Sequence, residues 1–117
     1  MRKVLVVEDE KSLRELLRIV LAQGGHMVLA AETAKEGIHL LLKHARDLDV
    51  LICDLGLPDM PAANVASVAR AANPQVKVLI ISGAPEEPTQ TVSIAAPYRF
   101  FAKPFSAADV LDFVNGT

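Results

Sequence analysis

The sequence predicts an α/β domain in which five strands alternate with helices. Short apolar runs alternate along the chain with segments whose apolar residues recur every three or four positions. The clearest run is residues 50–58, where apolar residues lead into Asp54 before Gly56 and Pro58 end the run. Such a run, closed by turn formers, is typical of a strand buried on both faces. The alternation therefore favours a parallel sheet with helices on both sides.

Two helices are expected in the first half of the chain, between strands at residues 3–7, 26–31 and 50–54. Ser12 with Glu15, and Thr33 with Glu36, have capping-box spacing, which predicts a helix start at each position. The Gly24-Gly25 pair ends the first helix. The apolar stripes that would face the sheet are Leu13, Leu16, Leu17, Val20 and Leu21 in the first helix and Ile38, Leu41, Leu42 and Ala45 in the second.

The second half of the chain is expected to contain two further strands and two clear helices. A helix over residues 63–72 ends at Asn73-Pro74, and strands follow at residues 76–81 and 98–102. Ser106, with Asp109, caps a last helix. Three prolines within residues 85–97 suit a long helix poorly, so we expect at most a short or irregular fourth helix around residues 89–95.

Composition and charge exclude several classes of protein. The 117 residues are 51% hydrophobic and 22% charged, which is typical of one globular domain. A net charge of −2 offers no basic field for nucleic acid, and no run approaches the roughly 18 apolar residues of a membrane span. The single cysteine, Cys53, excludes an internal disulfide and a cysteine-based zinc site, and a cytoplasmic location is expected.

Polar residues lie at the ends of four of the expected strands. Glu8 and Asp9 follow the first strand, Asp54 ends the third, Ser82 follows the fourth and Lys103 follows the fifth. In a parallel sheet all of them lie along one edge, where α/β proteins build their sites. Carboxylates suit Mg²⁺, and a lysine and a hydroxyl can bind phosphoryl oxygens. The sequence therefore predicts a site for a divalent metal and a phosphoryl group.

Four stretches of the sequence carry a family resemblance, at residues 6–10, 54–58, 81–83 and 103–105. They read Val-Val-Glu-Asp-Glu, Asp-Leu-Gly-Leu-Pro, Ile-Ser-Gly and Lys-Pro-Phe, and they resemble the signature stretches of the receiver domain of two-component response regulators. The resemblance covers the whole chain. It implies a flavodoxin-like, doubly wound parallel sheet of strand order 2-1-3-4-5, in one receiver domain over residues 1–117 without an output domain.

The resemblance also implies how the phosphoryl group arrives. Asp54 would accept it from a phosphohistidine on a sensor histidine kinase or a histidine phosphotransfer protein. Asp9 and Asp54, with the Gly56 carbonyl, would bind Mg²⁺, and Glu8 would act directly or through a water. The domain would catalyse its own phosphorylation and a slow autodephosphorylation, without turning over a substrate, and would pass its state to a downstream protein.

Three further residues would couple phosphorylation to a change of shape. Lys103 would pair with one phosphoryl oxygen, and Ser82 would move to hydrogen-bond another. Phe100, three residues before Lys103, would be the aromatic switch coupled to Ser82. The resemblance also implies a cis Lys103-Pro104 bond, although only roughly 5–6% of X-Pro bonds in folded proteins are cis.

Some positions depart from the usual family pattern. Ala62 stands where a glycine is usual in the loop after the phosphorylation site, and Phe100 lacks the hydroxyl of the commoner tyrosine. The prolines of residues 85–97 weaken the helix through which most members dimerise. We therefore expect a monomer that stays monomeric when phosphorylated.

Other functions fit the sequence less well. A pseudo-receiver would bind proteins independently of phosphorylation, but the intact Asp9, Asp54 and Lys103 argue against it. A phosphohydrolase with an aspartate nucleophile would need a second acid two residues after the nucleophile, where Gly56 stands. A dinucleotide-binding role is excluded, because no G-x-G-x-x-G motif follows the first strand.

Overall fold

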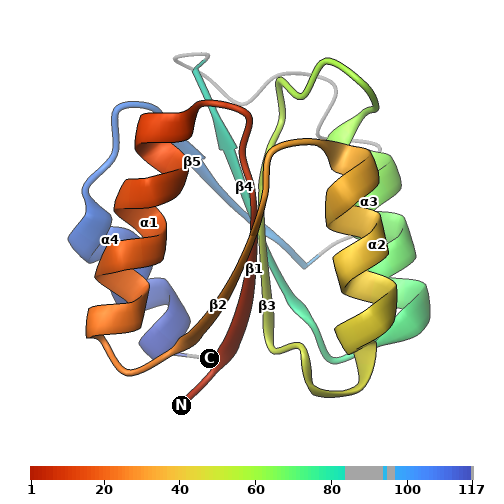
Figure 1. The fold of residues 1–117 in the computed structure, drawn as a ribbon, viewed down its shortest axis with the longest axis horizontal. Helices are drawn as coiled ribbons and strands as arrows, with labels where there is room; N and C mark the ends of the chain where they lie inside the picture. The colour runs from red at the N-terminus through yellow and green to blue at the C-terminus, as the bar shows by residue number, and fades with distance from the viewer. Residues whose placement is uncertain (84–93, 95–96, 117) are drawn as a thin grey trace.

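The computed structural model describes residues 1–83, 94 and 97–116, which form a five-stranded parallel sheet with helices on both faces (Figure 1). The elements are β1 (Lys3–Val7), α1 (Lys11–Gln23), β2 (Met27–Ala31), α2 (Ala34–His44), the short 3₁₀ helix η1 (Ala45–Asp47), β3 (Val50–Asp54), α3 (Ala62–Ala72), β4 (Lys77–Ser82), β5 (Arg99–Ala102) and α4 (Ala107–Asn115). The strand order is β2-β1-β3-β4-β5, which confirms the predicted flavodoxin-like topology.

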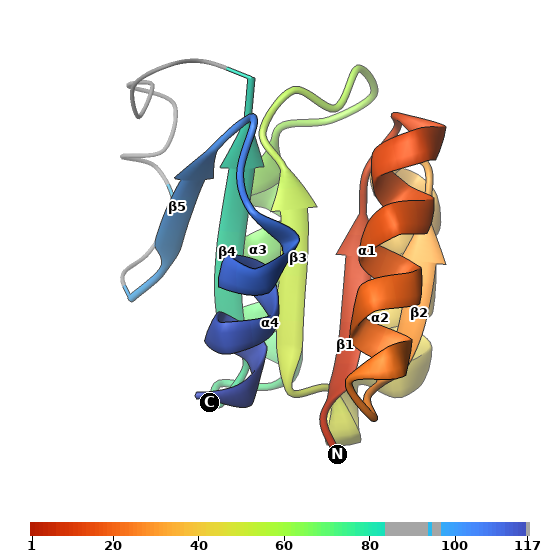
Figure 2. The same cartoon turned by 90° about the vertical axis from the view of Figure 1, so that its left-hand side faces the viewer.

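Helices α1 and α4 lie on one face of the sheet, and α2 and α3 lie on the other (Figure 1 and Figure 2). Successive side chains of a strand point to opposite faces, so β3 contributes to two separate cores. Leu51 and Cys53 pack on the side of α2 and α3, whereas Val50 and Ile52 pack on the side of α1 and α4, and all four are buried. This position explains the uninterrupted apolar run that precedes Asp54.

The edge strands are less buried than the centre of the sheet. In β2, Met27 is 46% exposed, and the residues of β5 are exposed or half-buried. The irregular helix predicted around residues 89–95 falls on a segment of which only Ile94 is described, and Ile94 packs into the core beneath α2 and α3. Among the described helices, none combines the length and the apolar composition that crossing a membrane requires.

Side chains at two helix starts act as the predicted caps. Thr33 Oγ1 accepts a hydrogen bond of 3.1 Å from the amide of Glu36, and Ser106 Oγ accepts one of 3.1 Å from the amide of Ala108. The glycine pair after α1 also ends that helix as predicted. Gly25 has a φ of 89°, a backbone conformation that favours glycine.

The cap predicted at Ser12 is wrong. Helix α1 already begins at Lys11, so Ser12 lies inside the helix, and its hydroxyl donates to Glu10 Oε1 at 3.1 Å. Glu15, the expected second member of the capping box, pairs instead with Arg18 at 2.8 Å. The capping-box spacing is present, but the turn that follows β1 sets the start of the helix before it.

The apolar stripes of the helices are narrower than predicted. Leu17 of α1 and Leu41 of α2 are buried, but Leu16 and Leu42 are 48% and 60% exposed. Each exposed leucine directly neighbours a buried one in sequence, and neighbours on a helix point about 100° apart. Only one residue of each pair can therefore face the sheet.

Gly37 lets α2 approach β1 closely. A Cβ atom built at this glycine would lie 2.7 Å from Val7 Cγ2, closer than side chains pack in a protein interior. Val7 directly precedes Glu8 in sequence. Helix α2 therefore packs so closely against the carboxyl end of β1 that a larger residue at this position would have to displace the Val7 side chain.

Candidate functional site

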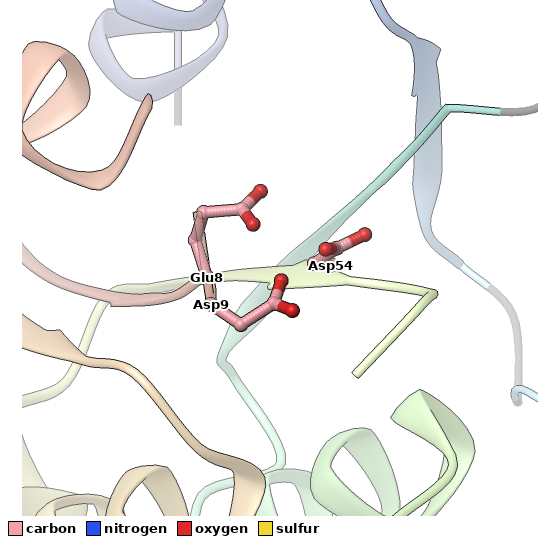
Figure 3. A group of neighbouring side chains, drawn as sticks. All are labelled: Glu8, Asp9 and Asp54. Atoms are coloured by element: carbon pink, nitrogen blue, oxygen red, sulfur yellow. The ribbon is translucent and has the colours of Figure 1, made fainter. Parts of the chain in front are cut away.

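Three carboxylates gather at the carboxyl edge of the sheet and form the acidic site, Glu8, Asp9 and Asp54 (Figure 3). Glu8 and Asp9 follow β1, and Asp54 is the last residue of β3. One oxygen from each residue lies within 4.8 Å of the others. Glu8 is completely buried and Asp54 is 5% exposed, whereas Asp9 is exposed. The cluster is thus buried on one side and reachable from solvent on the other.

Strand register brings the three acids together. Strands β1 and β3 are adjacent and parallel, with Val7 opposite Cys53, so Glu8 and Asp54 leave the sheet at the same level. The amide of Glu8 donates to the carbonyl of Ala31 in β2 at 3.0 Å, which extends the ladder one residue beyond β1. The convergence expected from the sequence is therefore produced by ordinary parallel pairing.

The turn that contains Glu8 and Asp9 is held by contacts that the sequence did not reveal. Glu8 Oε2 accepts a hydrogen bond of 3.0 Å from the amide of Glu10. Arg14 Nη1, on the first turn of α1, donates to the carbonyl of Glu8 at 2.8 Å and lies 3.5 Å from the carbonyl of Asp9. The position of Arg14, a few residues after the acidic turn, is the signal that could have identified it.

The side chain of Asp54 is oriented by the loop that follows it. Its Oδ1 accepts a hydrogen bond of 3.1 Å from the amide of Gly56. The amide of Leu55 donates to the carbonyl of Ile81 in β4 at 2.8 Å, which fixes the start of the loop. Asp54 Oδ2 lies 3.4 Å from Lys103 Nζ. One carboxylate oxygen thus bonds to the backbone, and the other faces an ammonium group.

Lys103 reaches the acidic site from beyond the end of β5. Its Nζ lies 2.9 Å from Glu8 Oε1, at the distance of an ion pair. Glu8 Oε1 is buried, so this ammonium compensates its negative charge away from solvent. The amide of Lys103 donates to the carbonyl of Ser82 at 2.6 Å, and the Lys103-Pro104 bond is cis, as the resemblance implied.

Ser82 lies at the same edge as the acids. It ends β4 opposite Ala102 of β5 and is 6% exposed. Phe100 lies opposite Ile80, two residues further from this edge, and its half-buried ring packs against the core beneath α2 and α3. The structure thus places Ser82 beside the backbone of Lys103, and Phe100 deeper on the same strand pair.

Burial and nearby charges shift the ionisation of these groups. Burial, together with the charge of Asp54, raises the pKa of Glu8 to about 7, although the Glu10 amide and Lys103 act in the opposite direction. Burial would also raise the pKa of Asp9, but side-chain contacts with Glu8 and Asp54 outweigh it and hold the pKa below its usual value. Burial opposes the charge on Lys103, but both carboxylates it faces raise its pKa. Asp9 and Lys103 are therefore charged at neutral pH, whereas Glu8 binds its proton near neutrality.

The donors of the acidic site fit a hard divalent cation. Three carboxylates face one ammonium group, so negative charge is in excess. The Glu8 carboxylate is completely buried and pairs with the Lys103 ammonium, and burial of such a charge is costly unless positive charge lies close to it. Mg²⁺ prefers oxygen ligands and keeps several waters, so it needs only a few side chains. The acidic site is therefore compatible with Mg²⁺.

Comparison with known proteins identifies the family. A family model described as the response regulator receiver domain matches residues 4–115. The response regulator protein FleR of Pseudomonas aeruginosa is 32% identical over 114 residues, which are 96% of this chain and 24% of FleR. The virulence transcriptional regulatory protein PhoP of Salmonella typhimurium is 34% identical over 113 residues, 95% of this chain and 49% of PhoP. The chain thus spans about a quarter to a half of these relatives.

Solved structures share the fold. A response regulator receiver protein from Sinorhizobium medicae has a TM-score of 0.85 and 26% identity, over 98% of this chain and 92% of that one. The response regulator TrrA of Thermotoga maritima, in complex with Mg²⁺-BeF, has a TM-score of 0.81 over 99% of this chain and 98% of that one, and its 22% identity supports the fold alone. Because the family model spans nearly the whole sequence, the chain belongs to the response regulator receiver domain family of two-component systems.

Proposed function

We propose that this receiver domain accepts a phosphoryl group on Asp54 from a phosphohistidine, with Mg²⁺ as its cofactor. The position of the Asp54 carboxylate supports the proposal. It ends the central strand, lies within 4.8 Å of the Glu8 and Asp9 carboxylates and is 3.4 Å from the Lys103 ammonium. A nucleophile, metal ligands and a cation for the phosphoryl oxygens thus lie side by side.

In the proposed transfer, an oxygen of Asp54 forms a bond to phosphorus as the bond from phosphorus to the donor's imidazole nitrogen breaks. The electron pair of that bond stays on the nitrogen, and an imidazole protonated on its other nitrogen leaves as a neutral ring. The hydrogen bond from the Gly56 amide to Asp54 Oδ1 orients the attacking carboxylate. Positioning and charge stabilisation are most of what phosphoryl-transfer catalysis requires.

Asp9 and Asp54, with the Gly56 carbonyl, would hold Mg²⁺, and Glu8 would act directly or through a water. When bound, Mg²⁺ neutralises the negative charge that develops on the phosphoryl oxygens. Asp9 is suited to this role, because its low pKa keeps it ionised at neutral pH and its side chain is exposed. Glu8 is the buried partner, and a cation would help to compensate its charge, which it shares with Asp54 opposite the Lys103 ammonium.

The proposal assigns the response to Lys103, Ser82 and Phe100. Lys103 would pair with one phosphoryl oxygen, and the Ser82 hydroxyl would move to hydrogen-bond another. The amide of Lys103 donates a hydrogen bond of 2.6 Å to the carbonyl of Ser82, so a displacement of Ser82 would move residues at the ends of both β4 and β5. Phe100 lies on this strand pair and would change position as the aromatic switch.

The phosphoryl donor in this proposal is a sensor histidine kinase or a histidine phosphotransfer protein in the cytoplasm. A downstream protein would read the surface that the switch changes. FleR and PhoP are named as regulators, and this chain matches one part of each. We propose the receiver domain of residues 1–117 as the unit that reacts.

Incubation of the domain with Mg²⁺ and a small phosphodonor such as acetyl phosphate tests the proposal, read by intact mass. We expect the mass of one added phosphoryl group, released by hydroxylamine as an acyl phosphate would be. Asp54→Asn is nearly isosteric and should remain unmodified. Asp49→Asn is the matched control, because Asp49 binds the Lys3 amide at the opposite end of β3. Modification of Asp54→Asn at the parent's rate would contradict the assignment, and an unmodified parent would favour a pseudo-receiver.

A further inference from the structure

Asp59 lies in the loop that follows Asp54, outside the acidic site, and its side chain binds the first turn of α2. Asp59 Oδ1 accepts a hydrogen bond of 3.0 Å from the amide of Ala34, and Asp59 Oδ2 accepts one of 3.0 Å from the amide of Lys35. Both donors are amides at a helix start, which have no partner inside the helix. These bonds hold the pKa of Asp59 below its usual value, so the carboxylate is ionised.

The rest of the loop is attached to the sheet. The Leu55 amide bonds to the carbonyl of Ile81 in β4, and the Gly56 amide bonds to Asp54 itself. Leu57 is 7% exposed and packs in the core beneath α2 and α3. Asp59 differs from these contacts, because it links the loop that contains Gly56 to a helix that is distant in sequence.

The same helix also supports the other half of the acidic site. Gly37, one turn beyond Ala34, packs against Val7 so closely that an added Cβ would lie 2.7 Å from Val7 Cγ2. Val7 directly precedes Glu8 and Asp9. The first turns of α2 thus contact both segments that supply the carboxylates, the end of β1 through Gly37 and the loop after β3 through Asp59.

From these contacts we infer that Asp59 is a positioning residue for the metal site: its carboxylate fixes the Gly56 loop to the helix that supports the Glu8–Asp9 turn, and so sets the separation of the site's two halves. The inference rests on the proposed function, because it concerns Mg²⁺ at the acidic site. Asp59 itself binds backbone amides with both oxygens and is no ligand.

Loss of this tie should weaken Mg²⁺ binding without unfolding the domain. We expect Asp59→Ala to bind Mg²⁺ about tenfold more weakly, the lower end of what removal of a group supporting metal ligands costs. The affinity is measured from the rise in melting temperature over a series of Mg²⁺ concentrations, by ligand linkage. Phosphorylation by acetyl phosphate should be slow at low Mg²⁺ and should recover when Mg²⁺ is raised.

Thr33→Ala is the matched control. Thr33 caps the same helix by accepting a hydrogen bond from the Glu36 amide, and within the described residues its side chain makes no hydrogen bond to the loop after β3. Both variants should lose stability, because each removes a cap from α2. Only Asp59→Ala should lose affinity for Mg²⁺, because helix capping alone does not involve the Gly56 loop.

A second control separates position from charge. Glu36→Gln removes one negative charge from the first turn of α2 without touching the loop. Its effect on Mg²⁺ affinity should be small and should disappear at high salt, because interactions between exposed charges are screened. The deficit of Asp59→Ala should persist at the same salt concentration. A deficit that salt removes would overturn the inference.

The remaining outcomes are equally decisive. Mg²⁺ affinity in Asp59→Ala within about twofold of the parent, or an equal loss in Thr33→Ala, would overturn the positioning role. If Asp59→Ala fails to fold, Asp59→Asn replaces it; this variant retains one acceptor oxygen and should show an intermediate loss, and a parent-like affinity would count against the inference. Asp9→Ala reports on the site itself: if it binds Mg²⁺ like the parent, the proposed metal site fails, whatever Asp59→Ala does.

Discussion

Charged side chains at the two edges of the sheet have different surroundings. At the amino edge, where the strands begin, Lys3 Nζ lies 2.8 Å from Asp47 Oδ2, and the amide of Lys3 donates to Asp49 Oδ2 at 2.8 Å. Asn73 Nδ2 donates to the carbonyl of Leu48 at 2.9 Å. Each of these groups is paired within the chain and links neighbouring elements of the fold.

At the carboxyl edge, the acidic side chains are not each paired with a positive charge. Glu8 and Asp54 share the ammonium of Lys103, and Asp9 adds a third carboxylate beside them. Burial there raises the pKa of Glu8 to about 7.

The difference separates structural charges from functional ones. At the amino edge, polar groups that are paired within the chain stabilise turns and leave little for a ligand to bind. At the carboxyl edge, the excess negative charge disfavours the metal-free fold, and a cation that relieves it is bound with the corresponding free energy.

Asp9→Ala should abolish the response of the domain to Mg²⁺. In the parent, Mg²⁺ at a hundredfold excess over its dissociation constant should stabilise the fold by about 2.7 kcal/mol through ligand linkage. The variant loses the exposed ligand of the acidic site and should show no shift. Thermal unfolding with and without Mg²⁺ measures the effect, with Asp47→Ala at the amino edge as the control that keeps the full shift. An undiminished shift in Asp9→Ala would remove the contrast between the edges.

Glu8→Gln should stabilise the metal-free domain at pH 8 but not at pH 5. The pKa of Glu8 is raised from 4.5 to about 7 in the fold, so the stability linked to its proton is complete below pH 4.5 and is lost as the pH rises through 7. Glutamine stays neutral and avoids this loss, which is on the order of 2 kcal/mol. Urea unfolding in the presence of EDTA at both pH values measures it. Equal stability of variant and parent at pH 8 would mean that the buried carboxylate is adequately compensated.

Gly56→Asn together with Ala84→Glu should speed loss of the phosphoryl group about tenfold, which corresponds to ~1.4 kcal/mol of barrier. In the parent, neither position offers a polar group to hold an attacking water. The substitution at Gly56 is tolerated by the space available, because a Cβ there would lie 3.7 Å from Asp54 Oδ1, an ordinary contact. Decay of the phosphorylated species after removal of the donor gives the rate. An unchanged or longer half-life would show that water positioning does not limit hydrolysis.

Asp47→Ala should have the smallest effect of these substitutions. Its ion pair with Lys3 is at the surface, where the Asp47 side chain is 69% exposed, and such pairs contribute little to stability. Unfolding experiments should find a small loss that vanishes at high salt. A loss comparable with the changes at the carboxyl edge would mean that the amino-edge network acts as a unit.

The sequence predicted what depends on strand periodicity and on strand ends. The apolar run before Asp54 identified the central strand, and the polar residues at the ends of four strands identified the edge where they meet. These features can be identified from short stretches of sequence. Parallel pairing of the strands then brings their carboxyl ends together. The strand order came from the family resemblance, and the structure confirms it.

Contacts between distant segments could not be predicted in the same way. Nothing in the spacing of Asp59 indicates that it binds the amides of Ala34 and Lys35. Glycine is intrinsically unfavourable inside a helix, and only the packing against Val7 explains Gly37. Ser12 has the spacing of a helix cap, but the helix already begins at Lys11. Each of these depends on how elements pack, which a single sequence does not specify locally.

Cys53 gives the domain an intrinsic chemical reporter of the opening of its core. It is the single cysteine of the chain, it is completely buried, and it directly precedes Asp54. Burial also raises the pKa of its thiol, so the folded protein holds it in the unreactive protonated form. A thiol reagent can therefore modify it only in molecules in which the core between the sheet and helices α2 and α3 has transiently opened. The modification rate under native conditions measures how often that opening occurs, with no label added, and a ligand of the acidic site should slow it in proportion to its occupancy.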